Sequence, residues 1–103
     1  MSQGAIGILV RDNRYLDYVL NFTSAAFDKG YQILIFFSGR GVLLTQEAKF
    51  ENIINLSTPY ICEVSYRAHG FEGREIPGVV FKQFVTQARN AEMLEECERY
   101  LVF

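Results

Sequence analysis

The residue best suited to chemistry is Cys62, one of two cysteines in a chain with a single histidine. Its sulfur stands where an extended apolar segment, Tyr60-Ile61-Cys62, stops and a brief polar helix, residues 64–68, begins. The free backbone N–H groups at the start of a helix carry partial positive charge, which favours a thiolate. Because free cysteine is also among the most buried residue types, simple core packing is the alternative interpretation.

Further polar residues follow the other apolar segments. The run at residues 5–10 ends in Arg11-Asp12-Asn13, and the run at residues 33–37 ends in Ser38-Gly39-Arg40-Gly41. Because sites in open parallel sheets gather beyond the carboxyl ends of the strands, we expect these turns to lie with Cys62 along one edge. The predicted binding residues around the sulfur are Arg11, Ser38, Arg40, Ser65 and Arg67. An arginine would supply a positive field, a serine hydroxyl a hydrogen bond to sulfur, and His69 a proton.

The remaining reactive side chains lack the pattern of a metal or cofactor site. Cys62, Cys97 and His69 are far apart in the sequence and form no C-x-x-C pair, so we predict no metal. The turn Ser38-Gly39-Arg40-Gly41 matches neither the P-loop nor the G-x-G-x-x-G pattern, and we predict no cofactor. The stretch Glu95-Glu96-Cys97-Glu98 places carboxylates beside the second cysteine, which disfavours a thiolate and indicates a structural role for it.

Apolar runs and helical periodicities alternate along the whole chain. The expected strands are residues 5–10, 33–37, 60–62, 79–85 and 100–103. The expected helices are residues 16–27 with Asp12 or Asn13 as cap, 42–56, 64–68, and 90–98 with Asn90 as cap. No hairpin turn interrupts this alternation, and parallel neighbours need crossover connections. The sequence therefore predicts a three-layer α/β/α sandwich around a mainly parallel five-stranded sheet.

Length and charge narrow the classes of function. With 103 residues, half of them apolar, the chain has the size of one domain spanning residues 1–103. A net charge of −2 without a basic stripe argues against a nucleic-acid partner. No apolar stretch reaches membrane-spanning length and nothing near Met1 resembles a secretory signal. We therefore expect a cytoplasmic protein without a membrane partner, whose cysteines remain free thiols.

Aromatic residues are numerous for so small a core, with nine Phe and six Tyr. Tyr15, Tyr18 and Phe22 form a stripe beside the main apolar face of the first expected helix. Surplus apolar surface of this kind predicts a subunit interface. The alternative is that these rings only cover the sheet.

Several of these features together resemble the DsrE/DsrF/TusD-like sulfur-relay family. They are the order of elements, Phe36-Phe37 before a glycine-containing turn, Cys62 leading into a short helix that ends at Gly70-Phe71, and the closing segment at residues 93–103. The resemblance spans nearly the whole chain. It implies an oligomer, either a dimer, trimer or hexamer, in which Cys62 carries sulfur as a persulfide. A donor protein would supply that sulfur and an acceptor protein's thiol would receive it.

Two functions follow for testing. The first is a sulfur carrier that accepts and passes on sulfur by thiol exchange at Cys62, which needs no metal, flavin or nucleotide. The second is a non-catalytic interaction or small-ligand-binding subunit of the same fold, in which Cys62 is structural. A carrier's Cys62 should be reachable from solvent and rich in thiolate, whereas a structural Cys62 should resist alkylation until the protein unfolds.

Overall fold

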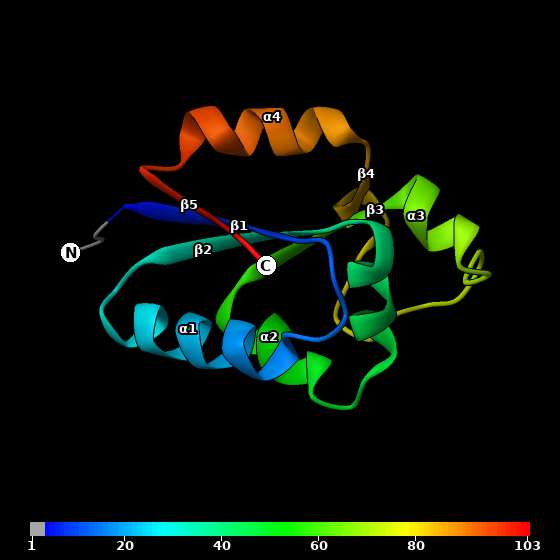
Figure 1. Cartoon of the computed structure of the whole chain (residues 1–103), viewed down its shortest axis with the longest axis horizontal. Coiled ribbons are helices and arrows are strands. Elements are labelled where there is room, and N and C mark those ends of the chain that lie inside the picture. The colour runs from blue at the N-terminus through cyan, green and yellow to red at the C-terminus, as the bar shows by residue number, and fades with distance from the viewer. Residues whose placement is uncertain (1–3) are drawn as a thin grey trace.

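The computed structural model describes residues 4–103 and builds them around a single sheet of five parallel strands (Figure 1). The strands are β1 (Ala5–Val10), β2 (Gln32–Phe37), β3 (Thr58–Cys62), β4 (Phe84–Val85) and β5 (Arg99–Val102). Their order across the sheet is β4-β3-β2-β1-β5. The chain therefore steps from β1 to β4 in one direction and then returns across the whole sheet to place β5 beside β1.

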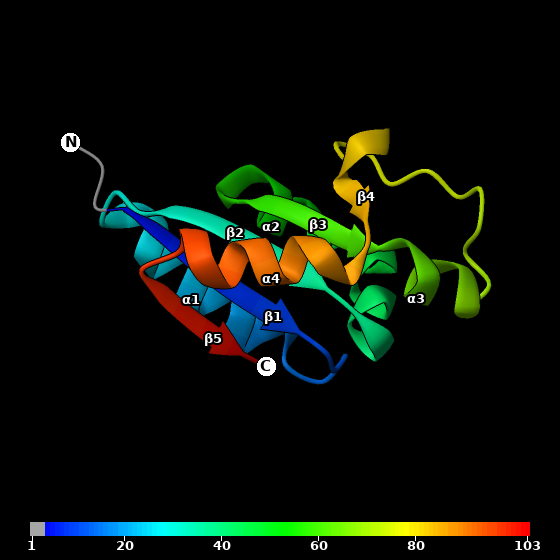
Figure 2. The same cartoon turned by 90° about the horizontal axis from the view of Figure 1, so that it is seen from above.

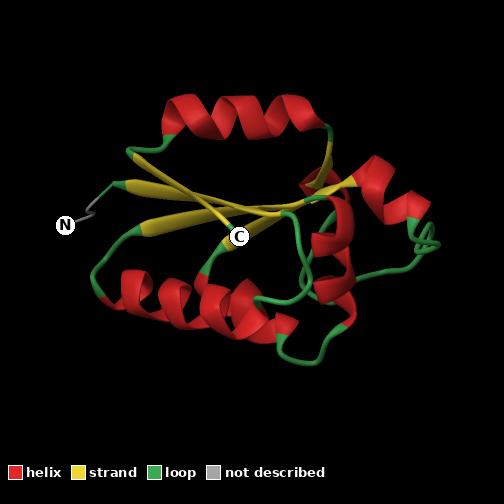
Figure 3. Cartoon of the chain, viewed as in Figure 1, coloured by secondary structure: helices red, strands yellow, loops and turns green. Residues whose placement is uncertain are grey.

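Helices cover both faces of this sheet, which confirms the predicted α/β/α sandwich. The α-helices are α1 (Leu16–Asp28), α2 (Phe50–Leu56), α3 (Glu63–Ala68) and α4 (Gln87–Glu96), with 3-10 helices η1 (Gly39–Gln46) and η2 (Phe81–Gln83). In Figures 1 and 3, α1 and α2 lie below the sheet and α4 lies above it. Figure 2 shows α4 crossing over the strands on the return from β4 to β5.

Alternation along the buried strands divides the core into two. Ile33, Ile35 and Phe37 of β2 pack in the larger cluster with α1 and α2 residues, whereas Leu34 and Phe36 face the smaller cluster beneath α4. Successive side chains of a strand point to opposite faces, so a fully apolar strand requires cover on both sides. The smaller cluster contains both cysteines and Met93.

The second predicted helix, residues 42–56, is wrong as a continuous element. The segment forms η1, then an extended turn at Glu47, then the short helix α2. A Cβ atom on Gly41 would lie 2.2 Å from the Val10 carbonyl oxygen, so the first turn packs directly on the end of β1. The Thr45 hydroxyl donates to the Val42 carbonyl at 2.7 Å, and this hydrogen bond stabilises the 3-10 helix η1.

The secondary structure of the last third of the chain differs most from the sequence prediction. Only Phe84–Val85 of the expected strand at residues 79–85 pairs with β3, through Val85 opposite Cys62. The Gln83 side chain accepts from Val80 N–H and donates to the Pro59 carbonyl, both at 2.8 Å, so it takes the place of strand hydrogen bonds.

Three helix or strand boundaries also need correction. Thr86, not Asn90, caps α4, because its hydroxyl accepts from the Ala88 N–H at 3.3 Å. Neither Asp12 nor Asn13 caps α1; the Asp12 carboxylate instead accepts from the Arg14 N–H at 3.0 Å. The third strand begins at Thr58 rather than Tyr60.

Candidate functional site

Cys62 ends β3 and occupies the cap position at the start of α3, as the sequence predicted. Its side chain is only 3% exposed and packs in the cluster beneath α4 with Met93 and Phe36. It is a free thiol, as is Cys97. The sulfur is thus held at the carboxyl edge of the sheet but covered by its neighbours.

Polar side chains from three separate segments surround this sulfur. The Gln87 Nε2 amide, on the first turn of α4, lies 3.6 Å from Cys62 Sγ and donates to Ser38 Oγ at 2.8 Å. The Gly39 N–H donates to Ser65 Oγ at 2.9 Å. Each serine oxygen therefore accepts a hydrogen bond from elsewhere, which leaves its own O–H proton free to donate to the sulfur. We call Ser38, Ser65 and Gln87 the thiol cradle.

The cradle changes the acidity of Cys62. Burial raises the pKa of the thiol, but the hydroxyl and backbone N–H of Ser65, the Gln87 amide and the Ser38 hydroxyl lower it, and the pKa lies below its usual range. These groups are neutral donors, which stabilise the charged thiolate more than the thiol. The largest lowering effects come from Ser65, in the first turn of α3, and Gln87 and Ser38 add to them from outside that helix.

The three strand ends meet as expected, but the side chains of Arg40 and Arg67 contact other residues. Arg40 Nη2 donates to Asn13 Oδ1 at 3.3 Å, which links the first two turns. Arg67 pairs with Glu63 at 3.0 Å on the exposed side of α3. Arg11 is exposed, and its backbone N–H donates to the carbonyl oxygen of Phe103. The groups named as lowering the pKa of Cys62 are hydrogen-bond donors, and no arginine is among them.

The other two candidates lie away from the sulfur. His69, the suggested proton source, follows the opposite end of α3 and stacks on Phe71 with ring centroids 6.5 Å apart. Cys97 lies at the end of α4, where burial and then the Glu96 carboxylate raise the pKa of its thiol. This direction agrees with the structural role predicted for Cys97.

Gln87 is the site residue that sequence reasoning missed. The rule that sites follow strand ends applies to β4 as well, and Thr86-Gln87 directly follow its last residue, Val85. Placing the start of the helix at Asn90 hid this signal. A helix beginning at Gln87 puts the amide beside the end of β3, because Val85 pairs with Cys62.

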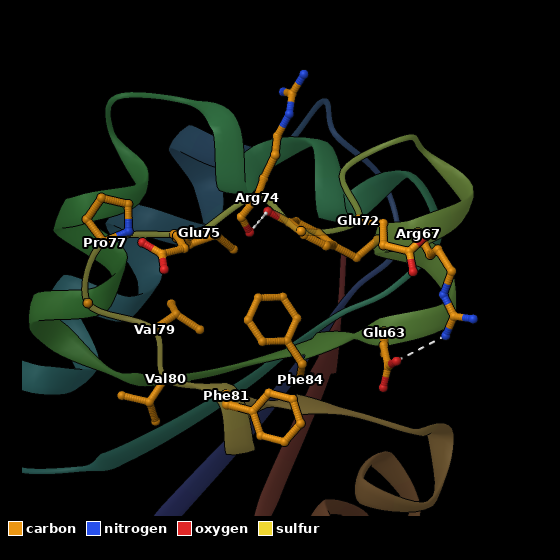
Figure 4. Close-up of a pocket in the computed structure, with 14 residues that line it drawn as sticks. Glu63, Arg67, Glu72, Arg74, Glu75, Pro77, Val79, Val80, Phe81 and Phe84 are labelled. Atoms are coloured by element: carbon orange, nitrogen blue, oxygen red, sulfur yellow. Dashed lines mark hydrogen bonds and ion pairs between the residues drawn. The ribbon is translucent and has the colours of Figure 1, made fainter.

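A separate hollow lies next to α3, and Cys62 is not among the residues that line it. It has a volume of about 990 Å³ and is bounded by α3, the loop at residues 72–80 and the β4 segment. Figure 4 shows the Phe84 ring projecting into it and the Glu63–Arg67 pair at its rim. We call this hollow the α3 groove.

Searches for related proteins found no matching family model, no curated relative and no similar solved structure. Within residues 4–103, no group of three or more His, Cys, Asp and Glu side chains is placed to hold a metal ion. In the same residues, no helix has the length and apolar character needed to cross a membrane. The site must therefore be interpreted from its own geometry.

Proposed function

We propose that this protein is a sulfur carrier of the relay type, which holds sulfur as a persulfide on Cys62 and passes it to a partner's thiol. The observation that supports this proposal is the thiol cradle, in which donors from three segments converge on one sulfur and lower its pKa. A cysteine that served only as packing would need no such donors. The resemblance of the sequence to the DsrE-like family points in the same direction.

Each transfer is a thiol exchange that balances without an oxidant. The Cys62 thiolate attacks the outer sulfur of a donor persulfide, R–S–SH; the new Sγ–S bond forms, the donor S–S bond breaks, and the donor leaves as R–S⁻. An acceptor thiolate then attacks the outer sulfur of Cys62–S–SH, and Cys62 leaves as the thiolate. A lowered pKa helps in both steps, because it increases the thiolate fraction and makes Cys62 a better leaving group.

Access to the sulfur requires one small movement. Cys62 is 3% exposed, yet Gln87, whose amide contacts the sulfur, is itself exposed. A partner thiol that displaced the Gln87 side chain would reach Sγ without opening the core. We include in the proposal a cytoplasmic location, where both thiols stay reduced, donor and acceptor proteins that dock in turn, and self-association of the chain.

The second candidate is a non-catalytic binding subunit in which Cys62 is structural. The low exposure of Cys62 and the separate α3 groove favour this alternative. The two functions differ in how the native thiol reacts.

The deciding experiment is alkylation of the folded protein with iodoacetamide across a range of pH, followed by incubation with a persulfide donor and mass spectrometry. Cys62→Ser and Cys97→Ser are the matched variants. A carrier should label at Cys62 at a pH below that of an ordinary thiol and gain one sulfur atom, and Cys62→Ser should abolish both. If Cys62 labels only on unfolding and no sulfur is added, the binding-subunit function replaces the carrier.

A further inference from the structure

An exposed aromatic residue stands on the rim of the α3 groove. Phe81, in η2, is 92% exposed, and the preceding Val80 is 53% exposed. Single exposed apolar residues are common, but two neighbours beside a groove form a patch that water solvates poorly. Val80 and Phe81 line one side of the groove, and Figure 4 places the Phe81 ring below Phe84. An exposed apolar segment and a hollow thus lie next to each other on one surface. We call the segment Val80-Phe81-Lys82 the knob.

The groove has an apolar wall. Tyr66 and Ile76 are buried and line it together with the half-buried Phe84. The Tyr66 hydroxyl donates to the Arg74 carbonyl at 2.9 Å, which holds the loop against α3 and keeps the wall in place. Aromatic and aliphatic side chains of this kind suit the insertion of another aromatic ring.

Some of the charged residues that line the groove form ion pairs, and others do not. Glu63 pairs with Arg67, and the Arg74 guanidinium stacks on the Phe71 ring at 5.1 Å. The exposed carboxylates of Glu72 and Glu75 form no ion pair within residues 4–103, and neither does Arg74, so the charged residues that line the groove carry one net negative charge.

The knob carries the opposite charge. Lys82 directly follows Phe81, is exposed, and forms no ion pair with any residue in the described range. An apolar ring followed by a cation is the chemistry that an apolar groove with free carboxylates accepts. The segment Val80-Phe81-Lys82, whose first two residues line the groove of their own chain, is therefore complementary to the same groove in another copy.

We propose that the α3 groove binds the Val80-Phe81-Lys82 segment of a second copy of this chain, forming a two-fold dimer. In such a dimer each Phe81 enters the groove of the other copy, and each Lys82 approaches the partner's Glu72 and the partner's Glu75. A two-fold interface is self-complementary, so one knob and one groove on each chain are sufficient. This proposal rests on the self-association included in the proposed function, but it does not depend on the chemistry of Cys62.

The test measures the dimer of the full chain by sedimentation over a concentration series. Phe81→Ser should weaken dimerisation at least about tenfold, because aromatic residues at interface centres carry much of the binding energy. Phe27→Ser is the matched control, since Phe27 is also an exposed phenylalanine but lies on α1. It should leave the dimer unchanged.

Charge reversal makes the test specific. Lys82→Glu alone and the pair Glu72→Lys with Glu75→Lys should each weaken the dimer, because each homodimer then has like charges in contact. Mixed together, the two variants should form a heterodimer, since both of its contacts unite opposite charges.

Three results would overturn the dimer proposal: a wild-type chain that stays monomeric at about 1 mM, a dimer that Phe81→Ser leaves intact, or reversed variants that fail to associate. Sulfur loading of Cys62 is measured on the same variants. The carrier function can therefore fail while the dimer stands, and the reverse is equally visible.

Discussion

Replacing Gln87 with alanine tests whether the thiol cradle controls the reactivity of Cys62. The substitution removes the amide that lies 3.6 Å from the sulfur and also the 2.8 Å hydrogen bond that orients Ser38. A hydrogen bond to a charged group contributes about 1.5–3 kcal/mol, and water entering the space would replace part of it. With about 1.4 kcal/mol per tenfold change, we expect the thiolate fraction at a fixed pH below the midpoint to fall roughly three- to tenfold.

The assay is the iodoacetamide labelling rate of Cys62 as a function of pH, in a Cys97→Ser background that removes the second thiol. The midpoint of the profile is the correct readout, because loss of the exposed Gln87 side chain also uncovers the sulfur and raises the absolute rate. The midpoint should move to higher pH in Gln87→Ala and further in Gln87→Glu, whose carboxylate repels a thiolate. Gln32→Ala, an exposed glutamine at the opposite end of the sheet, is the control.

An unchanged midpoint in Gln87→Ala would refute the contribution of the Gln87 amide to the lowered pKa and would leave Ser65 and Ser38 as its cause. A shift to lower pH would refute it more strongly, since it would mean that burial, and not hydrogen bonding, dominates at this sulfur.

Three further predictions concern the framework of the site. Gly41→Ala should destabilise the protein by about 1–3 kcal/mol or more in urea unfolding, because its Cβ atom would lie 2.2 Å from the Val10 carbonyl oxygen. Met93→Ala should cost about 2–5 kcal/mol in the same assay and loosen α4, since Met93 is fully buried beneath it. The cysteines should act oppositely on stability. The lowered pKa of Cys62 adds stability that is complete above the free-thiol pKa of about 8.5 and is lost as pH falls through the folded pKa. The raised pKa of Cys97 adds stability that is complete below about 8.5 and is lost as pH rises through the folded pKa. The free energy of unfolding of Cys62→Ser and of Cys97→Ser should therefore be measured against pH. Relative to wild type, its dependence on pH should change in opposite directions in the two variants.

The fold and the location of the site were accessible from the sequence because they depend on local pattern. Buried strands such as β1 and β2 are continuous apolar runs, and parallel strands of that kind need helices on both faces. Once the strands were placed, topology alone brought Ser38, Ser65 and Cys62 to one edge. The hydrogen bond between Gly39 and Ser65, across 26 positions of sequence, is a direct product of that arrangement.

The parts that the sequence did not predict depend on side-chain direction and tertiary packing. Long arginine side chains pair with whatever acceptor lies within reach, and Arg67 finds Glu63 one turn away. Gln87 reaches the sulfur only because α4 docks over the sheet on its return to β5, and no local periodicity specifies that docking. The pattern of residues 79–85 favours a strand, but the Gln83 side chain satisfies the backbone there instead.

The Cys62 thiolate can be stabilised by the positive charge of nearby arginines or by the neutral hydrogen-bond donors of the thiol cradle, and salt dependence distinguishes the two. Exposed cations act through solvent, and their influence falls as the screening length shortens from about 10 Å at 0.1 M salt to about 3 Å at 1 M. Hydrogen bonds from Ser38, Ser65 and Gln87 to a sulfur that is 3% exposed act at contact, where mobile ions cannot enter. The pH midpoint of Cys62 labelling should therefore stay constant between about 0.1 and 1 M salt. A midpoint that rises with salt would instead assign the stabilisation to Arg11, Arg40 or Arg67, as the sequence alone had suggested, and would require those side chains to turn toward the sulfur in solution.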